Sequence, residues 1–308
     1  MKKYKVIANP IAGHGTALRA IPILETLLHK YQLDYEIVRT ERSGHALELA
    51  REAAIAGIDV VVSAGGDGTA NEVINGLMEA KLLGHSTSVL GVIGIGRGND
   101  FAHGVGIPHD LEQACQVLVA DHRRAIDIGR VVGGIYPQGR YFGNVVGVGF
   151  DAIATIEVMK LPRWGGFLSF YIAVLRTIFL YSKGPTIEIQ YDGKTITQPC
   201  LLVSVMNGRR LGGGFWMAPN SKPDDGLFDI CIAREVSQLR VFNLIPHFLR
   251  GTQATQPEIT MDQAKHISIT AQKGSLPAET DGEILCIDGQ HLEVELLPKQ
   301  LEVVCQAP

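Results

Sequence analysis

A single carboxylate, Asp67, stands among three glycines in the stretch SAGGDGT at residues 63–69. Glycines lack a Cβ, so a ligand can approach the backbone closely, and the amide N–H groups that begin a helix bind anions such as phosphate. Because a carboxylate repels phosphate, Asp67 fits there if it holds Mg²⁺ through water or orients a donor group. The stretch predicts a site for a nucleotide phosphate, with a tight turn and a solvated Asp67 as the alternative.

Two further glycine-rich stretches follow apolar runs in the same way, NPIAGHGT at residues 9–16 and GIGRGNDFA at residues 94–102. Neither has the GxxxxGKS or GxxxxGKT spacing of a P-loop, or the GxGxxG spacing of a dinucleotide fold. If the preceding runs are parallel strands, their carboxyl ends meet at one edge of a sheet, where such sheets bind ligands. Three loops at that edge predict a site for a ligand of the ATP type.

A second pair of acids, Asp281 and Glu283, lies in TDGE at residues 280–283. On an extended segment, two residues apart, both side chains would point the same way. A carboxylate there could orient a hydroxyl acceptor and then take its proton during phosphoryl transfer. Asp-Gly is also the commonest pair in tight turns, so the residues alone leave a hairpin turn equally open.

The first part of the chain alternates short apolar runs with helical patterns. Strands are expected at residues 4–8, 35–40, 59–64 and 88–96, and helices at residues 17–31, 45–57, 71–83 and 111–121. Strands that alternate with helices pair in parallel, and their connections lie on both faces of the sheet. This pattern predicts a Rossmann-like, doubly wound α/β domain over residues 1–126.

The second part of the chain consists of many short strands separated by turn residues. Asp192-Gly193, between TIEIQY and KTITQ, suits the turn of a hairpin. Helical stretches interrupt the strands around residues 150–182 and 236–250. The pattern predicts a mainly antiparallel β-sandwich over residues 127–308, with a return of about the last ten residues to the first domain left open. We expect the active site in the cleft between the two domains.

Composition and charge exclude several classes of protein. A net charge of −4 argues against nucleic-acid binding, which needs a concentrated basic face. The five cysteines form no CxxC pair, which is typical of reduced thiols in a cytosolic protein. Neither an HExxH zinc motif nor a GxSxG nucleophile motif occurs. The most apolar stretch, residues 165–183, is interrupted by Arg176 and predicts a buried or interfacial helix rather than a transmembrane one.

Taken together, the motifs resemble those of a known family. NPIAG, GGDGTANEV and GRGNDFA occur in this order, and they are followed by DIG at 127–129, GNVVGVGFDA at 143–152, APNSKPDDGLFD at 218–229 and TDGE. The series is similar to that of the bacterial diacylglycerol-kinase-type lipid kinases, relatives of the sphingosine and ceramide kinases. NAD kinases and phosphofructokinases share the GGDGT loop more distantly. The resemblance covers nearly the whole chain and implies a nucleotide-binding α/β domain followed by a β-sandwich.

The resemblance implies which residues bind ATP. They are Asn9, Pro10, Ile11, Ala12, Gly13, Thr40, Gly65, Gly66, Asp67, Gly68, Thr69, Ala70 and Asn71. Among them, Asp67 would lie near the phosphates and their magnesium and take part in catalysis. Arg97 stands where many members of the family have Thr, and its guanidinium could bind a phosphate or alter the choice of nucleotide.

The resemblance also implies a metal site and a general base. A structural Mg²⁺ would be bound by the carboxylate of Asp225 and the main-chain carbonyls of Lys222 and Leu227, although from the residues alone DDGLFD could be a plain turn. Glu283 would be the general base, with Asp281 as its rival.

These expectations combine into an ATP- and Mg²⁺-dependent lipid kinase that phosphorylates a hydroxyl of a diacylglycerol-like or sphingoid lipid. We expect a cytoplasmic protein, peripheral at the inner face of the membrane, without nucleic-acid binding or a transmembrane span; a homodimer is left open. In the stretch 161–181, Arg163, Trp164 and Arg176 beside apolar residues fit an interfacial lipid site, or a core helix whose arginines reach solvent. The alternatives are an NAD-kinase-like enzyme of a soluble substrate and a non-catalytic regulator that binds nucleotide and lipid.

Overall fold

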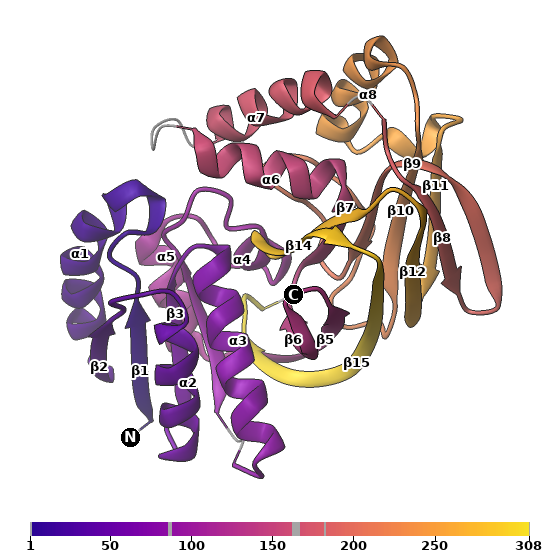
Figure 1. Ribbon diagram of the computed structural model, residues 1–308. Coiled ribbons are helices and arrows are strands. Elements are labelled where there is room, and N and C mark those ends of the chain that lie inside the picture. The colour runs from indigo at the N-terminus through magenta and orange to yellow at the C-terminus, as the bar shows by residue number, and fades with distance from the viewer. Residues whose placement is uncertain (1, 86–87, 162–166, 182, 308) are drawn as a thin grey trace. The chain divides into compact units, whose positions relative to one another are not determined.

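The structure, a computed structural model, describes residues 2–85, 88–161, 167–181 and 183–307 (Figure 1). The chain divides into two units. The first is formed by Met1–Asp127 together with Lys299–Pro308, and the second by Ile128–Pro298.

The first unit is a parallel sheet between two layers of helices. Its elements are β1 (Lys3–Ala8), η1 (Ala12–Gly15), α1 (Thr16–Lys30), β2 (Asp34–Arg39), α2 (His45–Ile55), β3 (Val60–Gly65), α3 (Asp67–Leu82), β4 (Val89–Gly94), α4 (Asp100–Gly104) and α5 (Leu111–Ala120). The strands lie in the order β4-β3-β1-β2, and neighbouring strands are parallel. Helix α1 packs against α5 and α2 packs against α3, so one pair covers each face of the sheet (Figure 1). The predicted doubly wound α/β fold is confirmed.

Burial explains the sequences of these elements. All six residues of β3, VVVSAG, are buried, as expected for a central strand covered on both faces. Gly76 lies where α3 meets α2, and a Cβ there would overlap the carbonyl oxygen of Leu47, so a glycine lets the two helices approach closely. The final strand of the chain, β15 (His291–Val304), also reaches this sheet, because Val303 pairs in parallel with Leu90 of β4.

The second unit is a mainly antiparallel β-sandwich, as predicted. Its further elements are β5 (Arg123–Gly133), β6 (Tyr136–Phe142), β7 (Val145–Gly149), α6 (Phe150–Lys160), α7 (Phe167–Leu180), β8 (Thr186–Tyr191), β9 (Lys194–Met206), β10 (Phe228–Arg234), α8 (Gln238–Arg250), η2 (Gln253–Thr255), β11 (Ile259–Ala264), β12 (His266–Lys273), β13 (Leu276–Thr280) and β14 (Glu283–Gly289). One layer follows the order β14-β13-β7-β9 and the other the order β9-β8-β12-β15. Strand β9 belongs to both layers, because its first half pairs with β8 and its second half with β7 and β10.

Two apolar clusters hold the second unit together. Alternate residues of β9 point into different clusters: Val203 and Val205 into the one between the sheet layers, and Leu202 and Met206 into the one beneath α6, α7 and α8. The three helices therefore cover the outer face of the strands that form one side of the sandwich.

The predicted hairpin at Asp192-Gly193 is confirmed. The pair joins β8 to β9, and both residues have positive φ angles, 42° and 79°, as a type I′ turn requires. Helix α7 contains most of the predicted apolar helix, whereas residues 162–166, with Arg163 and Trp164, lie outside the described residues. Of the helices described, none combines the length and the apolar character needed to cross a bilayer.

Candidate active site

The three glycine-rich loops of the first unit contact one another at the carboxyl ends of β1, β3 and β4. Nδ2 of Asn9 donates a hydrogen bond to Oγ1 of Thr69 (3.0 Å), which joins the first loop to the second. The amides of Ile95 and Gly96 donate to the carbonyl of Gly65 (2.8 and 3.1 Å), which joins the third loop to the second. The predicted convergence of the loops at one edge of the sheet is therefore confirmed.

Glycines permit these contacts where a side chain would not fit. A Cβ on Gly96 would overlap the Cα of Gly66, and a Cβ on Gly13 would lie 2.7 Å from the carbonyl oxygen of Ile95. Gly13 also has a φ of 56°, which residues with a side chain rarely adopt. The loops thus pack backbone against backbone, which gathers their amide groups at the end of the sheet.

Asp67 begins α3, and its carboxylate faces the start of α4. Its Oδ1 accepts a hydrogen bond from the amide of Phe101 (3.0 Å), and the amides of Asp100 and Asn99 also favour its charged form. Burial raises the pKa of the Asp67 carboxyl above its ordinary value, and the amides oppose this shift. The carboxylate therefore links the second loop to the third. Its position beside phosphates and magnesium stays a prediction.

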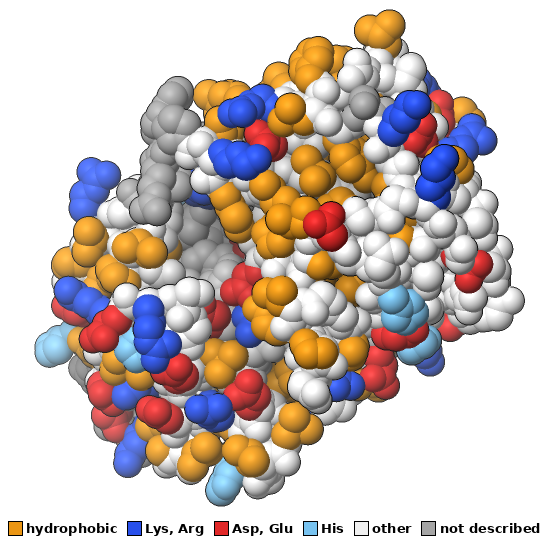
Figure 2. Space-filling model, in the orientation of Figure 1, with side chains coloured by type: hydrophobic (Ala, Val, Ile, Leu, Met, Phe, Trp, Pro, Cys, Tyr) orange, Lys and Arg blue, Asp and Glu red, His pale blue; other side chains and the backbone are white. Residues whose placement is uncertain are grey.

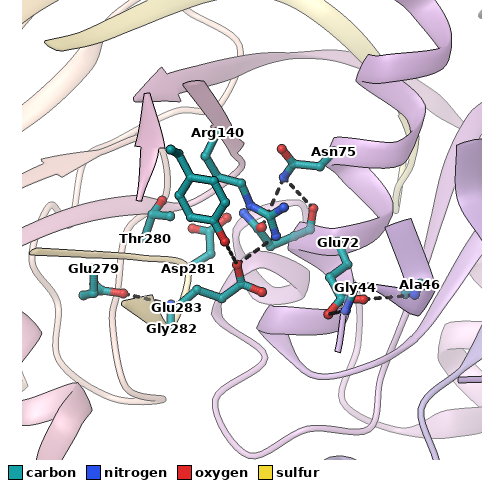
Figure 3. A network of polar contacts seen from close by, with 12 residues as sticks. Gly44, Ala46, Glu72, Asn75, Arg140, Glu279, Thr280, Asp281, Gly282 and Glu283 are labelled. Carbon is teal, nitrogen blue, oxygen red and sulfur yellow. Dashed lines mark hydrogen bonds and ion pairs between the residues drawn. The ribbon is translucent and has the colours of Figure 1, made fainter. Parts of the chain in front are cut away.

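A fourth segment reaches the same edge after β2. The amide of Thr40 donates to the carbonyl of Ala8 (2.9 Å), which places Thr40 beside the first loop. The chain after Thr40 is fixed to α3 by Glu72, a residue of that helix. Its carboxylate accepts hydrogen bonds from the amides of Gly44 (2.8 Å) and Ala46 (3.0 Å) (Figure 3). Sequence reasoning missed this role of Glu72, although the residue belongs to the GGDGTANEV motif.

The other predicted nucleotide contacts lie on the same loops. They are Pro10, Ile11 and Ala12 after β1, Gly68, Ala70 and Asn71 in the first turns of α3, and Arg97 in the third loop. Arg97 is exposed, whereas Asn71 is buried and accepts a hydrogen bond from Nδ2 of Asn75 (3.1 Å). Which of these residues touch a nucleotide stays a prediction.

In the second unit, TDGE forms a tight turn between β13 and β14. Asp281 and Gly282 both have positive φ angles, 46° and 87°. Of the two conformations that the residues left open, the extended segment with both acids on one side is not the one found, because two left-handed residues in succession reverse the direction of the chain. The hairpin turn, which the residues alone left open, is the conformation found.

The two acids of this turn lie in different surroundings. Asp281 is 4% exposed, and its carboxylate accepts hydrogen bonds from three backbone amides between β6 and β7. These are the amides of Gly143 (2.9 Å, to Oδ2), Asn144 (3.1 Å, to Oδ1) and Val145 (2.9 Å, to Oδ1). Asp281 therefore clamps the turn to the neighbouring strands. With both oxygens bonded to amides, it is poorly placed to take a proton.

Glu283 is more accessible, with its side chain 24% exposed. Its Oε2 forms an ion pair with Nη2 of Arg140 (2.8 Å) and accepts a long hydrogen bond from the Tyr136 hydroxyl (3.5 Å) (Figure 3). The guanidinium of Arg140 also lies over the Tyr136 ring, 5.2 Å from its centroid. A carboxylate that is held on one side and partly open on the other can orient a hydroxyl group.

The predicted magnesium ligands lie on a turn before β10. Oδ1 of Asp225 accepts a hydrogen bond from the amide of Leu227 (3.1 Å), and Lys222 and Asp225 are both exposed. Nearby, Oδ2 of Asp229 is buried without a hydrogen-bond partner among the described residues, and burial raises the pKa of this carboxyl. Oxygen donors suit Mg²⁺, and a cation would stabilise the buried carboxylate, so these residues fit the ion. In the described part of the chain, this turn included, no three Asp, Glu, His or Cys side chains gather as a metal site.

Comparison with known proteins decides the family. Residues 3–131 match the family model of the diacylglycerol kinase catalytic domain, and residues 144–305 match that of the YegS C-terminal NAD kinase beta sandwich-like domain. A diacylglycerol kinase of Bacillus subtilis (strain 168) is 34% identical over 289 residues, which cover 92% of this chain and 90% of that protein. The chain belongs to the diacylglycerol kinase family.

Further relatives agree with membership of the diacylglycerol kinase family. A diacylglycerol kinase of Staphylococcus aureus (strain bovine RF122 / ET3-1) is 29% identical over 283 residues, 92% of this chain and 86% of that protein. The crystal structure of a diacylglycerol kinase from Bacillus anthracis str. Sterne matches with a TM-score of 0.73 and 25% identity, over 99% of this chain and 97% of that chain. Yeast NADH kinase complexed with NADH matches with a TM-score of 0.51 at 11% identity, over 99% of this chain and 84% of that chain, which shows a shared fold alone.

As a member of the diacylglycerol kinase family, the protein is a phosphotransferase that acts on an alcohol group. Sequence reasoning missed three residues around its predicted base, Arg140, Tyr136 and Glu279. Oε2 of Glu279 accepts a hydrogen bond from the amide of Gly282 (2.8 Å) and so fixes the turn (Figure 3). Arg140 lies 143 positions before Glu283, so no local spacing could have shown that the two side chains pair. The location of the active site in a cleft between the units stays a prediction.

Proposed function

We propose that the protein is an ATP- and Mg²⁺-dependent lipid kinase that transfers the γ-phosphate of ATP to a hydroxyl of a diacylglycerol-like lipid, with a sphingoid lipid as the second choice of acceptor. The observation that supports it best is the contact among three glycine-rich loops, joined through Asp67 and the backbone of Gly65. The relatives that match nine-tenths of this chain are named diacylglycerol kinases, which favours that acceptor.

The loop amides can bind phosphate oxygens without a P-loop lysine. Gly66, the N-cap of α3, has no side chain that could cap the helix, and the amides of the first turn stand at the positive end of the helix dipole, where an anion is favoured. Asp67 keeps the third loop at a fixed distance from them. When bound, Mg²⁺ neutralises charge on the phosphate oxygens. Positioning and charge neutralisation supply most of the catalysis in phosphoryl transfer.

We assign Glu283, rather than Asp281, as the carboxylate that receives the proton of the acceptor hydroxyl. Protonation of Asp281 would weaken its bonds to three buried amides, which opposes a role as base. Glu283 is 24% exposed, and its ion pair with Arg140 fixes the orientation of the carboxylate. In a loose transition state the proton moves late, so Glu283 first orients the hydroxyl and then takes the proton.

A lipid acceptor requires contact with a membrane, and α7 and α8 offer apolar side chains for it. Phe179 and Leu180 of α7 are 66% and 61% exposed, and Leu239 of α8 is 78% exposed. Phe179 packs edge-on against Phe242 of α8 (5.8 Å between centroids), so the two helices adjoin there. Figure 2 shows hydrophobic side chains with Lys and Arg among them over this part of the unit. Apolar groups beside basic ones favour binding to an anionic surface, and we propose peripheral binding at the inner face of the membrane.

Transfer of labelled phosphate tests the proposal directly. The protein is incubated with γ-labelled ATP and Mg²⁺ together with dispersed dioleoylglycerol, sphingosine or NAD, and the products are separated by thin-layer chromatography. We expect label on dioleoylglycerol, loss of that label with EDTA, and a fall in the rate of labelling by about a hundredfold or more with a folded Glu283→Gln variant. Label on NAD alone would establish an NAD-kinase-like enzyme. ATP binding without a labelled product from any acceptor would establish a regulator, and either result would overturn the proposal.

A further inference from the structure

Arg97 is the only lysine or arginine in the three glycine-rich loops, residues 9–16, 63–69 and 94–102. In the fourth segment at this edge of the sheet, Arg42 already forms an ion pair with Glu48 (2.6 Å). The Arg97 guanidinium has neither a hydrogen-bond partner nor an ion-pair partner among the residues that the structure describes. The loops therefore present one side-chain cation whose charge the described residues do not balance.

The backbone that carries Arg97 is fixed by Asn99. Oδ1 of Asn99 accepts a hydrogen bond from the amide of Gly96 (2.8 Å), and Nδ2 of Asn99 donates to the carbonyl of Gly96 (3.1 Å). Asn99 is buried and has a φ of 50°, a conformation that Asn tolerates better than most residues. Residues 96–99 thus form a closed loop with Arg97 and Gly98 at its tip, so the position of the Arg97 backbone is defined.

This tip lies beside the first turn of α3. A Cβ on Gly96 would be 2.4 Å from the Cα of Gly66 and 3.2 Å from its amide nitrogen, and Gly66 is the N-cap of α3. Arg97 is exposed, yet partial burial of its guanidinium lowers the pKa, and no carboxylate of the described residues opposes this shift. A guanidinium and the positive end of a helix dipole are therefore neighbours, and both favour an anion.

We propose that Arg97 binds the phosphate chain of the nucleotide, in the role that a lysine has in a P-loop, rather than its base. The inference rests on the proposed kinase function, which requires a nucleoside triphosphate. A guanidinium presents a planar fork of N–H donors, so it can bind two phosphate oxygens at once. A partly desolvated cation without a counter-charge gains most from an anionic ligand, and a neutral base supplies no such charge.

Competition for the nucleotide site separates the phosphate chain from the nucleoside. A fluorescent ATP analogue is bound to the protein in the presence of Mg²⁺ and displaced by inorganic tripolyphosphate, ATP or adenosine. Arg97→Thr removes the guanidinium and keeps a polar side chain. We expect it to weaken binding of tripolyphosphate and ATP at least tenfold and to leave binding of adenosine unchanged. Arg97→Lys keeps the charge without the fork, so its affinities should lie between those of the wild type and Arg97→Thr.

Lys3→Thr is the matched control for the loss of charge. Lys3 is exposed and begins β1, so it lies at the amino edge of the sheet, opposite the glycine-rich loops. The variant removes one positive charge from the same unit and is expected to bind all three competitors as the wild type does. An equal fall in tripolyphosphate affinity in Lys3→Thr and Arg97→Thr would show an effect of net charge alone, and it would overturn the proposal.

The outcomes separate the role of Arg97 from the kinase function. Weaker binding of adenosine by Arg97→Thr, with unchanged binding of tripolyphosphate, would make Arg97 a contact of the nucleoside and overturn the proposal. Unchanged affinity for all three competitors, with normal phosphorylation of dioleoylglycerol, would overturn the role of Arg97 and leave the proposed function in place. Loss of tripolyphosphate binding in Arg97→Thr, with no lipid phosphorylated by the wild type, would support the role of Arg97 and overturn the proposed function.

Discussion

Single substitutions of Asp281 and Glu283 distinguish a structural clamp from a base. Asp281→Asn keeps the size of the side chain, and Asn tolerates the positive φ of this position. The change removes a charge shared by three backbone amides, and it turns one oxygen into an NH₂ group that faces an N–H donor. A hydrogen bond to a charged group contributes about 1.5–3 kcal/mol and a neutral one about 1 kcal/mol. Two weakened bonds and one lost bond therefore amount to about 3–5 kcal/mol of unfolding free energy.

The two variants should then differ in what they change. Asp281→Asn should mainly lower the Tm, whereas Glu283→Gln should mainly lower the turnover. For a domain of the size of the second unit, 1 kcal/mol shifts the Tm by about 2–4 °C, so Asp281→Asn is expected to lower it by roughly 10 °C. Glu283→Gln should cost about 1 kcal/mol, because Gln keeps an oxygen for Arg140 at a partly exposed site. Its kcat should fall by about 10²–10⁴-fold with the Kd for ATP unchanged, as expected for loss of a general base.

The assay combines scanning calorimetry with transfer of labelled phosphate to dioleoylglycerol at a temperature well below both Tm values. Under these conditions Asp281→Asn should retain turnover. An Asp281→Asn variant with the Tm of the wild type and no turnover, beside an active Glu283→Gln variant, would refute the reasoning and make Asp281 the base.

Three further predictions concern the nucleotide loops, the buried acid and the membrane surface. Gly96→Ala places a Cβ against the Cα of Gly66 and should weaken ATP binding at least tenfold by calorimetry, with an unchanged circular dichroism spectrum. Burial raises the pKa of Asp151 to about 6, so its charged form destabilises the fold above that pH by up to about 3 kcal/mol. In urea unfolding, Asp151→Asn should be the more stable protein at pH 7.5, and its advantage should disappear as the pH falls from 6 to about 4, where the native carboxyl is protonated. Phe179→Ser combined with Leu180→Ser should reduce sedimentation with anionic vesicles at least fivefold without changing ATP affinity, and unchanged sedimentation would remove α7 from the membrane contact.

The parallel unit was predictable because its strands and loops are local features of the sequence. A strand buried on both faces needs a continuous apolar run, which VVV in β3 supplies, and the glycines after it mark the place where backbone meets backbone. Asp192-Gly193 was likewise predictable as a turn, because the pair favours positive φ angles. The same chemistry applies to Asp281-Gly282, so turn preference was the better guide there than strand periodicity.

The partners of the candidate catalytic residues were not predictable from spacing. Arg140 meets Glu283, and the amides of residues 143–145 meet Asp281, only through the pairing of strands that are distant in the sequence. Register between such strands is set by the packing of the whole sandwich rather than by either segment alone. An apolar pocket lined by α6, α7, α8 and β9 was not predictable for the same reason, since three helices and a strand each contribute a part of its wall.

Because of strand β15, the first unit is complete only after the second unit has been synthesised. Its residues up to Pro298 belong to the second unit, whereas from Lys299 onward they belong to the first, where the amide of Lys299 donates to Oδ1 of Asp127 (2.8 Å). The ribosome synthesises the residues from Lys299 onward after the second unit. During most of translation, the edge of the nascent N-terminal sheet at β4 is therefore unpaired. Premature release or a stalled ribosome would leave that edge free to pair with other chains. The N-terminal half is therefore expected to be the part that needs chaperones to prevent aggregation.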